Sequence, residues 1–334
     1  MATSKQVCQP TQRFTRSRRG RPTGPGEKFF KIMIIQVDNI TKKYGDLKAV
    51  DEVSMTVEKG ELVGIIGPDG AGKTTFLRML SGALEPTSGT VIVEGKTFSE
   101  NRRELKEDIG YLSQISQAYG DLTVWENLEF FGKIRKVRDW QERGERLLRF
   151  AGLAEFKGRL ADQLSGGMRQ KLGICCAVIH QPKILILDEP TTGVDPVSRR
   201  ELWLILASFL RNQMTIVVAT PYLNEAERCN KVALFNDGKL LRYNSVPGLI
   251  SETSLHVFEV HSRNLKRAFE VVSGFDFAES LVVLGDRISF VTPEASRDKV
   301  GSILEALRIK VDERAELKEI GASLDNIFAD LIKS

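Results

Sequence analysis

The chain has 334 residues, of which 42% are hydrophobic and 28% charged, a composition typical of a folded protein with room for one large and one smaller domain. No apolar run approaches the ~18 residues that a membrane-spanning helix needs, so the sequence predicts no span. Residues 1–31 carry eight Lys/Arg and one acid, whereas the other 303 residues carry 40 Lys/Arg and 43 Asp/Glu. The folded part is therefore nearly neutral, and no specific nucleic acid is expected as a partner.

The N-terminal segment 1–32 is basic, rich in Gly, Pro, Ser and Thr, and without hydrophobic periodicity, which predicts disorder. It lacks the apolar core of a secretory signal. Two explanations stay open: translation starts at Met33, or the segment is a basic arm that touches anionic lipid or RNA. The four cysteines show neither CxxC nor Cys/His ligand spacing, so no disulfide scaffold is predicted and the cytosol is the expected compartment.

Short β-rich runs alternate with helical stretches over residues 33–247, which predicts an α/β fold with parallel strands. The runs 183–188 (KILILD) and 215–220 (TIVVAT) are apolar between their end residues, as is typical of strands buried on both faces. A third strand is expected over 61–67. Residues from about 115 to 180 are mostly helical in pattern and predict a helical subdomain inserted into the sheet domain.

The pattern changes over residues 248–334. LHVFEV, SLVVL and RISFV predict strands, whereas NLKRAFEVV, DKVGSILEAL and the terminal LDNIFADLI predict helices. The order β-α-β-β-α-β-α fits a small ferredoxin-like α+β appendage. We expect a packing or dimerisation module there rather than a ligand sensor.

A glycine-rich turn, GPDGAGKTT, satisfies the pattern GxxxxGK[ST] between the strand expected over 61–67 and a helix expected over 73–80. Its glycines let successive N–H groups and the helix N-terminus surround a phosphate. Lys73 is expected to reach the β- and γ-phosphates of ATP, and the Thr74 hydroxyl to bind Mg²⁺. The predicted nucleotide-binding residues of this Walker A motif are Gly67, Asp69, Gly70, Ala71, Gly72, Lys73, Thr74 and Thr75.

Two further motifs point to phosphate chemistry. Asp188 and Glu189 directly follow ILIL, and a carboxylate at the tip of a buried strand can hold the metal's water shell, so Asp188 is predicted to bind Mg²⁺ and Glu189 to act as general base. The signature segment LSGGMRQ (164–170) opens another helix and offers a second phosphate-binding N-terminus. Two such helix N-termini cannot easily bind the phosphates of one nucleotide from the same side.

On these motifs the sequence resembles the ATP-binding cassette (ABC) ATPases, strongly over residues 33–245 and weakly beyond. Its tail, SLDNIFADLI, is similar to that of subunits of drug, lipid or polysaccharide exporters and of heavy-metal or antibiotic efflux systems. The resemblance implies a P-loop cassette with a mixed-sheet core. It also implies that two cassettes pair head to tail, so that LSGGM of one closes over the ATP held by the other.

The resemblance implies further roles. Tyr44 is similar to the aromatic that stacks on adenine, although an ordinary strand-edge tyrosine fits it equally well. Gln114 matches the Q-loop glutamine, which contacts Mg²⁺ or the lytic water, and the segment AYGDLTVWENLEFF after it resembles the surface that receives coupling helices of a membrane subunit. The residues implied to contact nucleotide across the dimer are Leu164, Ser165, Gly166, Gly167 and Asp195.

Two positions depart from the family pattern. Asp69 replaces the usual Walker A asparagine, and we expect its carboxylate to point to solvent. After the strand expected over 215–220 the family has a histidine that contacts the γ-phosphate, but the aligned residue here is Pro221. The combination resembles one cassette of certain two-cassette exporters whose other cassette keeps the full set.

The sequence therefore predicts an ATP-binding and ATP-hydrolysing subunit that energises a membrane exporter, peripheral at the cytoplasmic face. Its expected partners are a separate transmembrane permease subunit and a second cassette, either another copy or a histidine-containing paralogue. One alternative is a weakly hydrolytic regulatory subunit of a heterodimeric cassette pair. The other is a non-transport ABC protein that acts on the ribosome or DNA; such proteins usually carry two cassettes or a long coiled-coil insertion, for which this chain has no room.

Overall fold

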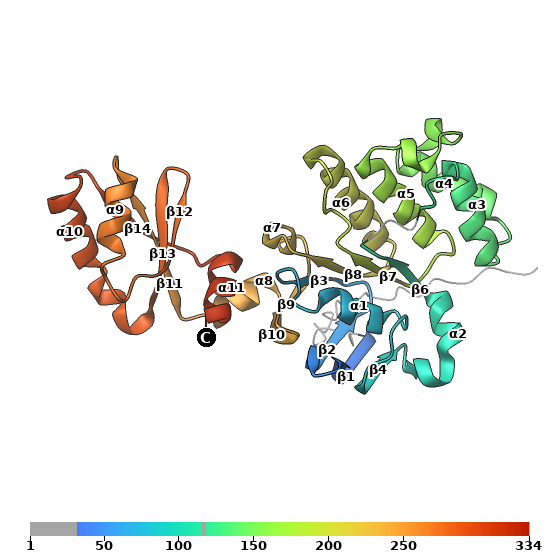
Figure 1. Cartoon of the computed structure of the whole chain (residues 1–334), viewed down its shortest axis with the longest axis horizontal. Coiled ribbons are helices and arrows are strands. Elements are labelled where there is room, and N and C mark those ends of the chain that lie inside the picture. Colours follow the sequence, from blue (N-terminus) through green and yellow to red (C-terminus); the bar gives the residue numbers. More distant parts are fainter. Residues whose placement is uncertain (1–31, 115–117, 334) are drawn as a thin grey trace, which may run out of the picture. The chain divides into compact units, whose positions relative to one another are not determined.

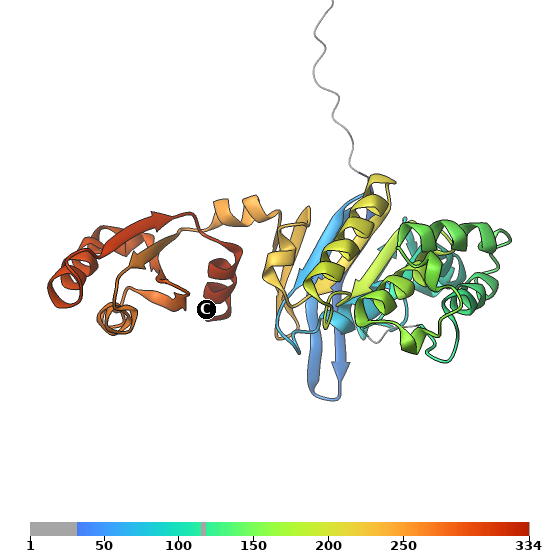
Figure 2. The same ribbon diagram turned by 90° about the horizontal axis from the view of Figure 1, so that it is seen from above.

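A computed structural model gives the fold for residues 32–114 and 118–333, so the disorder predicted for residues 1–31 lies outside the described part. Three β-sheets organise the described residues. The first is antiparallel, in the order β2-β1-β4-β5, and Figure 2 shows its long β1–β2 hairpin in blue. Its strands are β1 (Met33–Tyr44), β2 (Leu47–Glu58), β4 (Ser88–Val93) and β5 (Lys96–Thr97).

The second sheet is mixed, in the order β10-β9-β3-β8-β7-β6, and only its β9–β10 pair is antiparallel. Because β3, β8 and β7 are parallel neighbours, their carboxyl ends meet at one edge of the sheet, where α/β folds commonly bind ligands. The strands are β3 (Leu62–Ile66), β6 (Ile109–Leu112), β7 (Ile184–Asp188), β8 (Thr215–Thr220), β9 (Lys231–Asn236) and β10 (Lys239–Asn244). The predicted α/β fold with a mixed-sheet core is confirmed.

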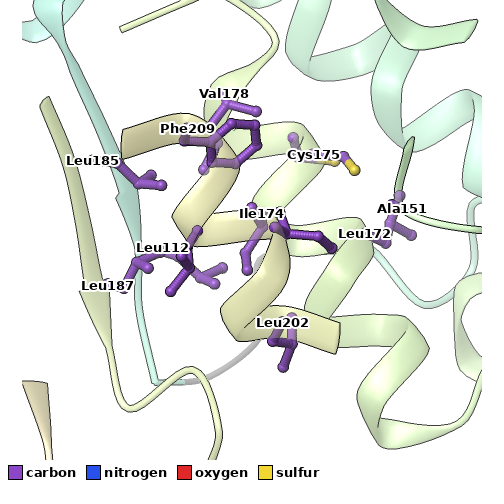
Figure 3. Close-up of a cluster of buried hydrophobic side chains, with 14 of the residues drawn as sticks. Leu112, Ala151, Leu172, Ile174, Cys175, Val178, Leu185, Leu187, Leu202 and Phe209 are labelled. Carbon is purple, nitrogen blue, oxygen red and sulfur yellow. The ribbon is translucent and has the colours of Figure 1, made fainter. Parts of the chain in front are cut away.

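The apolar strands are buried on both faces, as the sequence predicts. In β7, Leu185 and Leu187 pack in one cluster with helices α5 and α6, part of which Figure 3 shows, whereas Ile184 and Ile186 pack on the opposite side with α1 and the antiparallel sheet. Successive strand residues point to opposite faces, so the middle of a strand between two apolar layers is apolar on both faces, and the polar residues of β7 and β8 lie at the strand ends. The sheet thus lies between two hydrophobic cores, with α5 and α6 on one side (Figure 1).

Helices connect these strands. They are α1 (Lys73–Leu80), α2 (Phe98–Asp108), α3 (Val124–Ile134), α4 (Trp140–Phe150), α5 (Gly166–Val178), α6 (Pro196–Arg211) and the single turn α7 (Leu223–Ala226). The expected helix over 73–80 is confirmed. Helices α3, α4 and α5 lie in the predicted helical block, and α3 begins with a capping box in which Thr123 and Glu126 bond each other's main chain. Within the described residues, no helix is long and apolar enough to span a bilayer.

The C-terminal residues form a third, antiparallel sheet in the order β12-β13-β11-β14. The elements are α8 (Val246–Glu252), β11 (Leu255–His261), α9 (Leu265–Val272), β12 (Glu279–Leu284), β13 (Arg287–Pro293), α10 (Gly301–Lys310), β14 (Glu316–Ile320) and α11 (Leu324–Lys333). This confirms the order β-α-β-β-α-β-α and the α+β appendage. The division into domains 33–247 and 248–334 stays a prediction.

Candidate functional site

A cleft of about 390 Å³ lies at the carboxyl edge of the mixed sheet, where β3 runs through the glycine turn into α1. The turn needs glycine because Gly70 and Gly72 have φ of 84° and 96°, a left-handed region that other residues avoid. A Cβ on Gly72 would also lie 2.3 Å from the carbonyl oxygen of Ala49. This P-loop cleft is lined by Leu47, Lys48, Ala49, Asp69, Gly70, Gly72, Lys73, Thr74, Thr75, Gln114, Glu189, Asp237 and Gly238.

Lys73 is the buried cation of the P-loop cleft. Its side chain is 3% exposed, its Nζ donates to the carbonyl oxygens of Gly67 and Pro68 at 2.9 Å each, and Nζ lies 3.4 Å from a carboxylate oxygen of Glu189. Burying an ammonium is costly unless it is paired and hydrogen-bonded, and these three contacts meet that need. The amine is therefore fixed at the turn.

Asp188 and Thr74 offer oxygen atoms that suit a divalent cation. The Thr74 hydroxyl donates to Asp188 Oδ1 at 3.1 Å, while Oδ2 of the same carboxylate is buried and has no hydrogen-bond partner among residues 32–114 and 118–333. Burial raises the pKa of the Asp188 carboxyl, and the hydrogen bond from Thr74 opposes that shift. An unpaired buried carboxylate oxygen beside a hydroxyl fits Mg²⁺, which prefers hard oxygen ligands.

Glu189 lies one residue beyond β7 and is 5% exposed. Its φ of 50° is unusual for a non-glycine residue and turns the side chain away from the strand's alternation. One carboxylate oxygen accepts hydrogen bonds from Gln114 Nε2 at 3.1 Å and from the Thr192 hydroxyl at 3.2 Å. The structure thus brings together the side chains expected from the P-loop turn, from the end of β7 and from Gln114. Of the predicted positions in these motifs, Gly67, Ala71 and Asp188 do not line the cleft itself.

The signature segment and Asp195 do not line the P-loop cleft. Ser165 is exposed and caps α5, because its Oγ accepts from the Met168 N–H at 3.3 Å. Asp195 caps α6 in the same way, and the hydrogen bonds from the Ser198 and Val197 N–H groups lower the pKa of its carboxyl. Neither helix N-terminus therefore borders the chain's own cleft, and Gly166 is exposed while Leu164 is buried.

Three predicted positions lie at the margins. Tyr44 is 50% exposed and does not line the cleft, but it pairs across β1 and β2 with Leu47, which does, and directly opposed residues share a face. Asp69 is exposed on the cleft rim, as expected. Pro221 follows β8 directly and is half-buried.

Sequence reasoning missed five lining residues, Leu47, Lys48, Ala49, Asp237 and Gly238. They belong to the start of β2 and to the β9–β10 turn, which a main-chain hydrogen bond of 2.8 Å from Asp51 to Gly238 holds together. The pair Asp237–Gly238 is a hairpin signal in the sequence. It predicts a turn, but not that the turn borders the P-loop cleft.

Fold and cleft together define a P-loop nucleotide-binding cassette, and comparisons with known proteins specify it. A family model for the ABC transporter matches residues 50–192. The chain is 43% identical over 224 residues to a probable multidrug ABC transporter ATP-binding protein, YbhF, of Escherichia coli, covering 66% of this chain but only 39% of that relative's length. It is 36% identical over 265 residues to the Nod factor export ATP-binding protein I of Cupriavidus metallidurans, covering 78% of this chain and 87% of the relative.

A solved structure agrees with these relatives. The dimeric, post-hydrolysis structure of the ATP-binding cassette MJ0796 bound to ADP and Pi is 28% identical to this chain, with a TM-score of 0.59 over 64% of this chain and 98% of that one. This chain belongs to the ABC transporter family, as an ATP-binding cassette protein.

Proposed function

We propose that this chain is the ATP-hydrolysing subunit of a membrane exporter and that its P-loop cleft holds ATP with Mg²⁺. One observation carries the proposal: side chains from three motifs meet at one cleft. Lys73, Thr74, Gln114 and Glu189 line it, and the buried Asp188 accepts a hydrogen bond from Thr74 directly beside it. The relatives' names support export, because they describe multidrug transport and Nod factor export.

Each side chain has a distinct task in this proposal. Lys73 exchanges its contact with Glu189 for the β- and γ-phosphates. The oxygens of Thr74 and Asp188, with Gln114, would hold Mg²⁺, which when bound neutralises phosphate charge. Glu189, held by Gln114 and Thr192, accepts the proton of the attacking water.

Replacing Glu189 tests this assignment. Glu189→Gln keeps the size and the hydrogen-bond acceptor but removes the base, so we expect ATP hydrolysis to fall by roughly 10²–10⁴-fold while the Kd for MgATP changes by less than about twofold. Glu94→Gln is the matched control, because Glu94 pairs with Lys183 at the surface. Unchanged hydrolysis in Glu189→Gln would exclude Glu189 as the base.

A second cassette completes the site in this proposal. The exposed N-terminus of α5, with Leu164, Ser165, Gly166 and Gly167, contacts the γ-phosphate held by the partner cassette, and Asp195 contacts the partner across the same interface. Tyr44 stacks on the adenine at the margin of the chain's own cleft. The dimeric form of the MJ0796 cassette supports this arrangement.

Pro221 would weaken both sites of a homodimer, whereas in a heterodimer it would weaken only the site whose ATP this chain's P-loop cleft holds. Proline has no side-chain donor, so it cannot hydrogen-bond the γ-phosphate, and one lost transition-state contact typically costs ~10²–10³ in rate. We therefore expect weak hydrolysis by the isolated chain and pairing with a cassette that keeps the histidine. Turnover should rise in Pro221→His; robust turnover of the unmodified chain, with no gain from the substitution, contradicts the proposal.

A permease is the expected second partner, which places the chain at the cytoplasmic face of the membrane. Tyr119 and Phe130 are 47% and 38% exposed with ring centroids 5.0 Å apart, an aromatic surface beside the Q-loop. Pull-down from detergent-solubilised membranes should recover a polytopic protein, and Tyr119→Ala with Phe130→Ala should weaken recovery. Recovery of ribosomes or nucleic acid instead, with loss on deleting residues 1–31, would favour the alternative in which residues 1–31 are a basic arm.

A further inference from the structure

A buried carboxylate lies behind the P-loop cleft, at a position that no motif singles out. Glu225 belongs to the short turn α7 after β8 and is 2% exposed. A buried carboxylate is costly unless hydrogen bonds and an opposite charge compensate it. The partners of Glu225 therefore indicate what the residue holds in place.

Two threonine hydroxyls donate to the same oxygen of Glu225. Thr220, the last residue of β8, donates to Oε2 at 2.7 Å, and Thr191, two residues after Glu189, donates to Oε2 at 3.0 Å. Both threonines are themselves buried. One oxygen thus fixes the distance between the end of β8, where Pro221 replaces the family histidine, and the loop after β7.

The loop after β7 carries this constraint to Glu189. Thr191 is bonded covalently to Thr192, whose hydroxyl donates to Glu189 Oε2 at 3.2 Å. The Glu189 N–H also donates to the Ala219 carbonyl oxygen at 3.0 Å. Displacement of Thr191 would therefore move Thr192 and the carboxylate of Glu189.

Helix α6 reaches the same carboxylate from a third direction. Arg199 Nε lies 3.8 Å from Glu225 Oε1, and the Arg199 guanidinium lies 4.5 Å from the ring centre of Tyr222, the residue after Pro221. The Arg199 N–H donates to the carbonyl oxygen of Asp195 within the first turn of α6. The carboxylate therefore contacts all three segments that border the proposed site: β8, the loop after β7, and α6.

We propose that Glu225 is a positioning residue for hydrolysis: by accepting the hydroxyls of Thr191 and Thr220 it holds the Thr191–Thr192 loop, and through it the Glu189 carboxylate, in the orientation that the attacking water needs. The proposal rests on the role of Glu189 as base. Misplacing a catalytic group by about 1 Å can cost up to 10²-fold in rate without loss of binding.

Single-turnover hydrolysis with the full chain in excess over ATP tests the proposal and resolves slow rates. Glu225→Ala and Thr191→Val should each lower the rate constant by about 10-fold, with the Kd for MgATP within about twofold of the unmodified chain. Glu225→Gln, whose amide oxygen accepts both hydroxyls, should stay within about threefold. Thr292→Val is the control, because it also removes a buried threonine hydroxyl. That hydroxyl lies in the C-terminal sheet and donates to the carbonyl oxygen of Phe277.

The outcomes separate the two proposals. If Glu189→Gln still hydrolyses ATP at the unmodified rate, Glu189 is not the general base, and the inference loses its premise. If Glu189→Gln is inactive but Thr191→Val hydrolyses ATP like Thr292→Val, the positioning role is wrong. If Glu225→Gln hydrolyses ATP as slowly as Glu225→Ala, the proposal is also wrong, because the charge of Glu225 would then matter rather than its acceptance of the two hydroxyls. If Glu225→Ala does not fold, the rates of Thr191→Val and Glu225→Gln still test the positioning role.

Discussion

The P-loop cleft and the signature segment are both glycine-rich starts of helices, yet their surroundings differ. In the cleft, Lys73 and Glu189 are buried and lie within 3.4 Å of each other, and Lys73 also donates to neighbouring main-chain carbonyls. In the signature segment, Ser165 and Gly166 are exposed, and the Ser165 hydroxyl caps its own helix. The same local geometry thus forms a site within one chain at the P-loop cleft. At the signature segment, in our proposal, it forms a surface that a second cassette completes.

Packing of α5 against α6 explains the shape of the signature segment. A Cβ on Gly167 would lie 2.4 Å from the Cβ of Ser198 on α6, so the close approach of α5 and α6 requires glycine there. Gly166 has no such restriction, since a Cβ would meet only the Gly193 carbonyl oxygen at 3.6 Å. Gly166 is therefore the position at which a side chain can be added to the surface without disturbing the fold.

The largest effect is expected inside the cleft. Lys73→Ala removes the charge that faces the phosphates, and hydrogen bonds to charged groups are worth ~1.5–3 kcal/mol, so ATP affinity should fall by about 10- to 150-fold. Isothermal titration with MgATP measures it. Lys183→Ala, which removes a surface lysine paired with Glu94 and Asp108, should leave affinity unchanged. Equal affinity in Lys73→Ala and the unmodified chain would show that the cleft is not the ATP site.

An intermediate effect is expected at the signature segment. Ser165→Ala removes the N-cap of α5 and should lower the free energy of unfolding by about 1 kcal/mol, measured by chemical denaturation. The Kd of the isolated chain for MgATP should not change, because Ser165 does not line its own cleft. A loss of ATP affinity as large as that of Lys73→Ala would remove the contrast between the two regions.

The smallest effect is expected in the C-terminal sheet, which contributes no residue to the P-loop cleft or to the signature segment. Hydrogen bonds to Glu294 and Glu319 raise the pKa of His256 above its ordinary 6.5, with Arg297 also paired to Glu319. A raised folded-state pKa gives stability that is complete below pH 6.5 and is lost as pH rises through the raised pKa. The melting temperature should therefore fall slightly more on going from acidic to alkaline pH in the unmodified chain than in His256→Gln. Parallel pH profiles would contradict this.

The motifs could be predicted because their geometry is local. The glycines of the P-loop determine the backbone of their own turn. Asp188 could be identified because it directly follows four apolar residues, which places it at the end of a buried strand. The sequence could not predict that β2 and the β9–β10 turn line the cleft. These segments lie near the P-loop only because strands and turns that are distant in the sequence pair in the fold. Glu225 was missed for the same reason: Thr191 lies 34 residues before it in the sequence.

The central claim is that Gly166 of one cassette contacts the ATP that Lys73 of another cassette binds. Sedimentation velocity tests it most directly, with a chain that carries Glu189→Gln and should therefore leave ATP unhydrolysed. The account predicts dimers that depend on MgATP and that are abolished both by Lys73→Ala, inside the cleft, and by Gly166→Asp, whose carboxylate would repel the γ-phosphate from outside it. Dimers that persist in Gly166→Asp, or dimers that form equally well without MgATP, would contradict it.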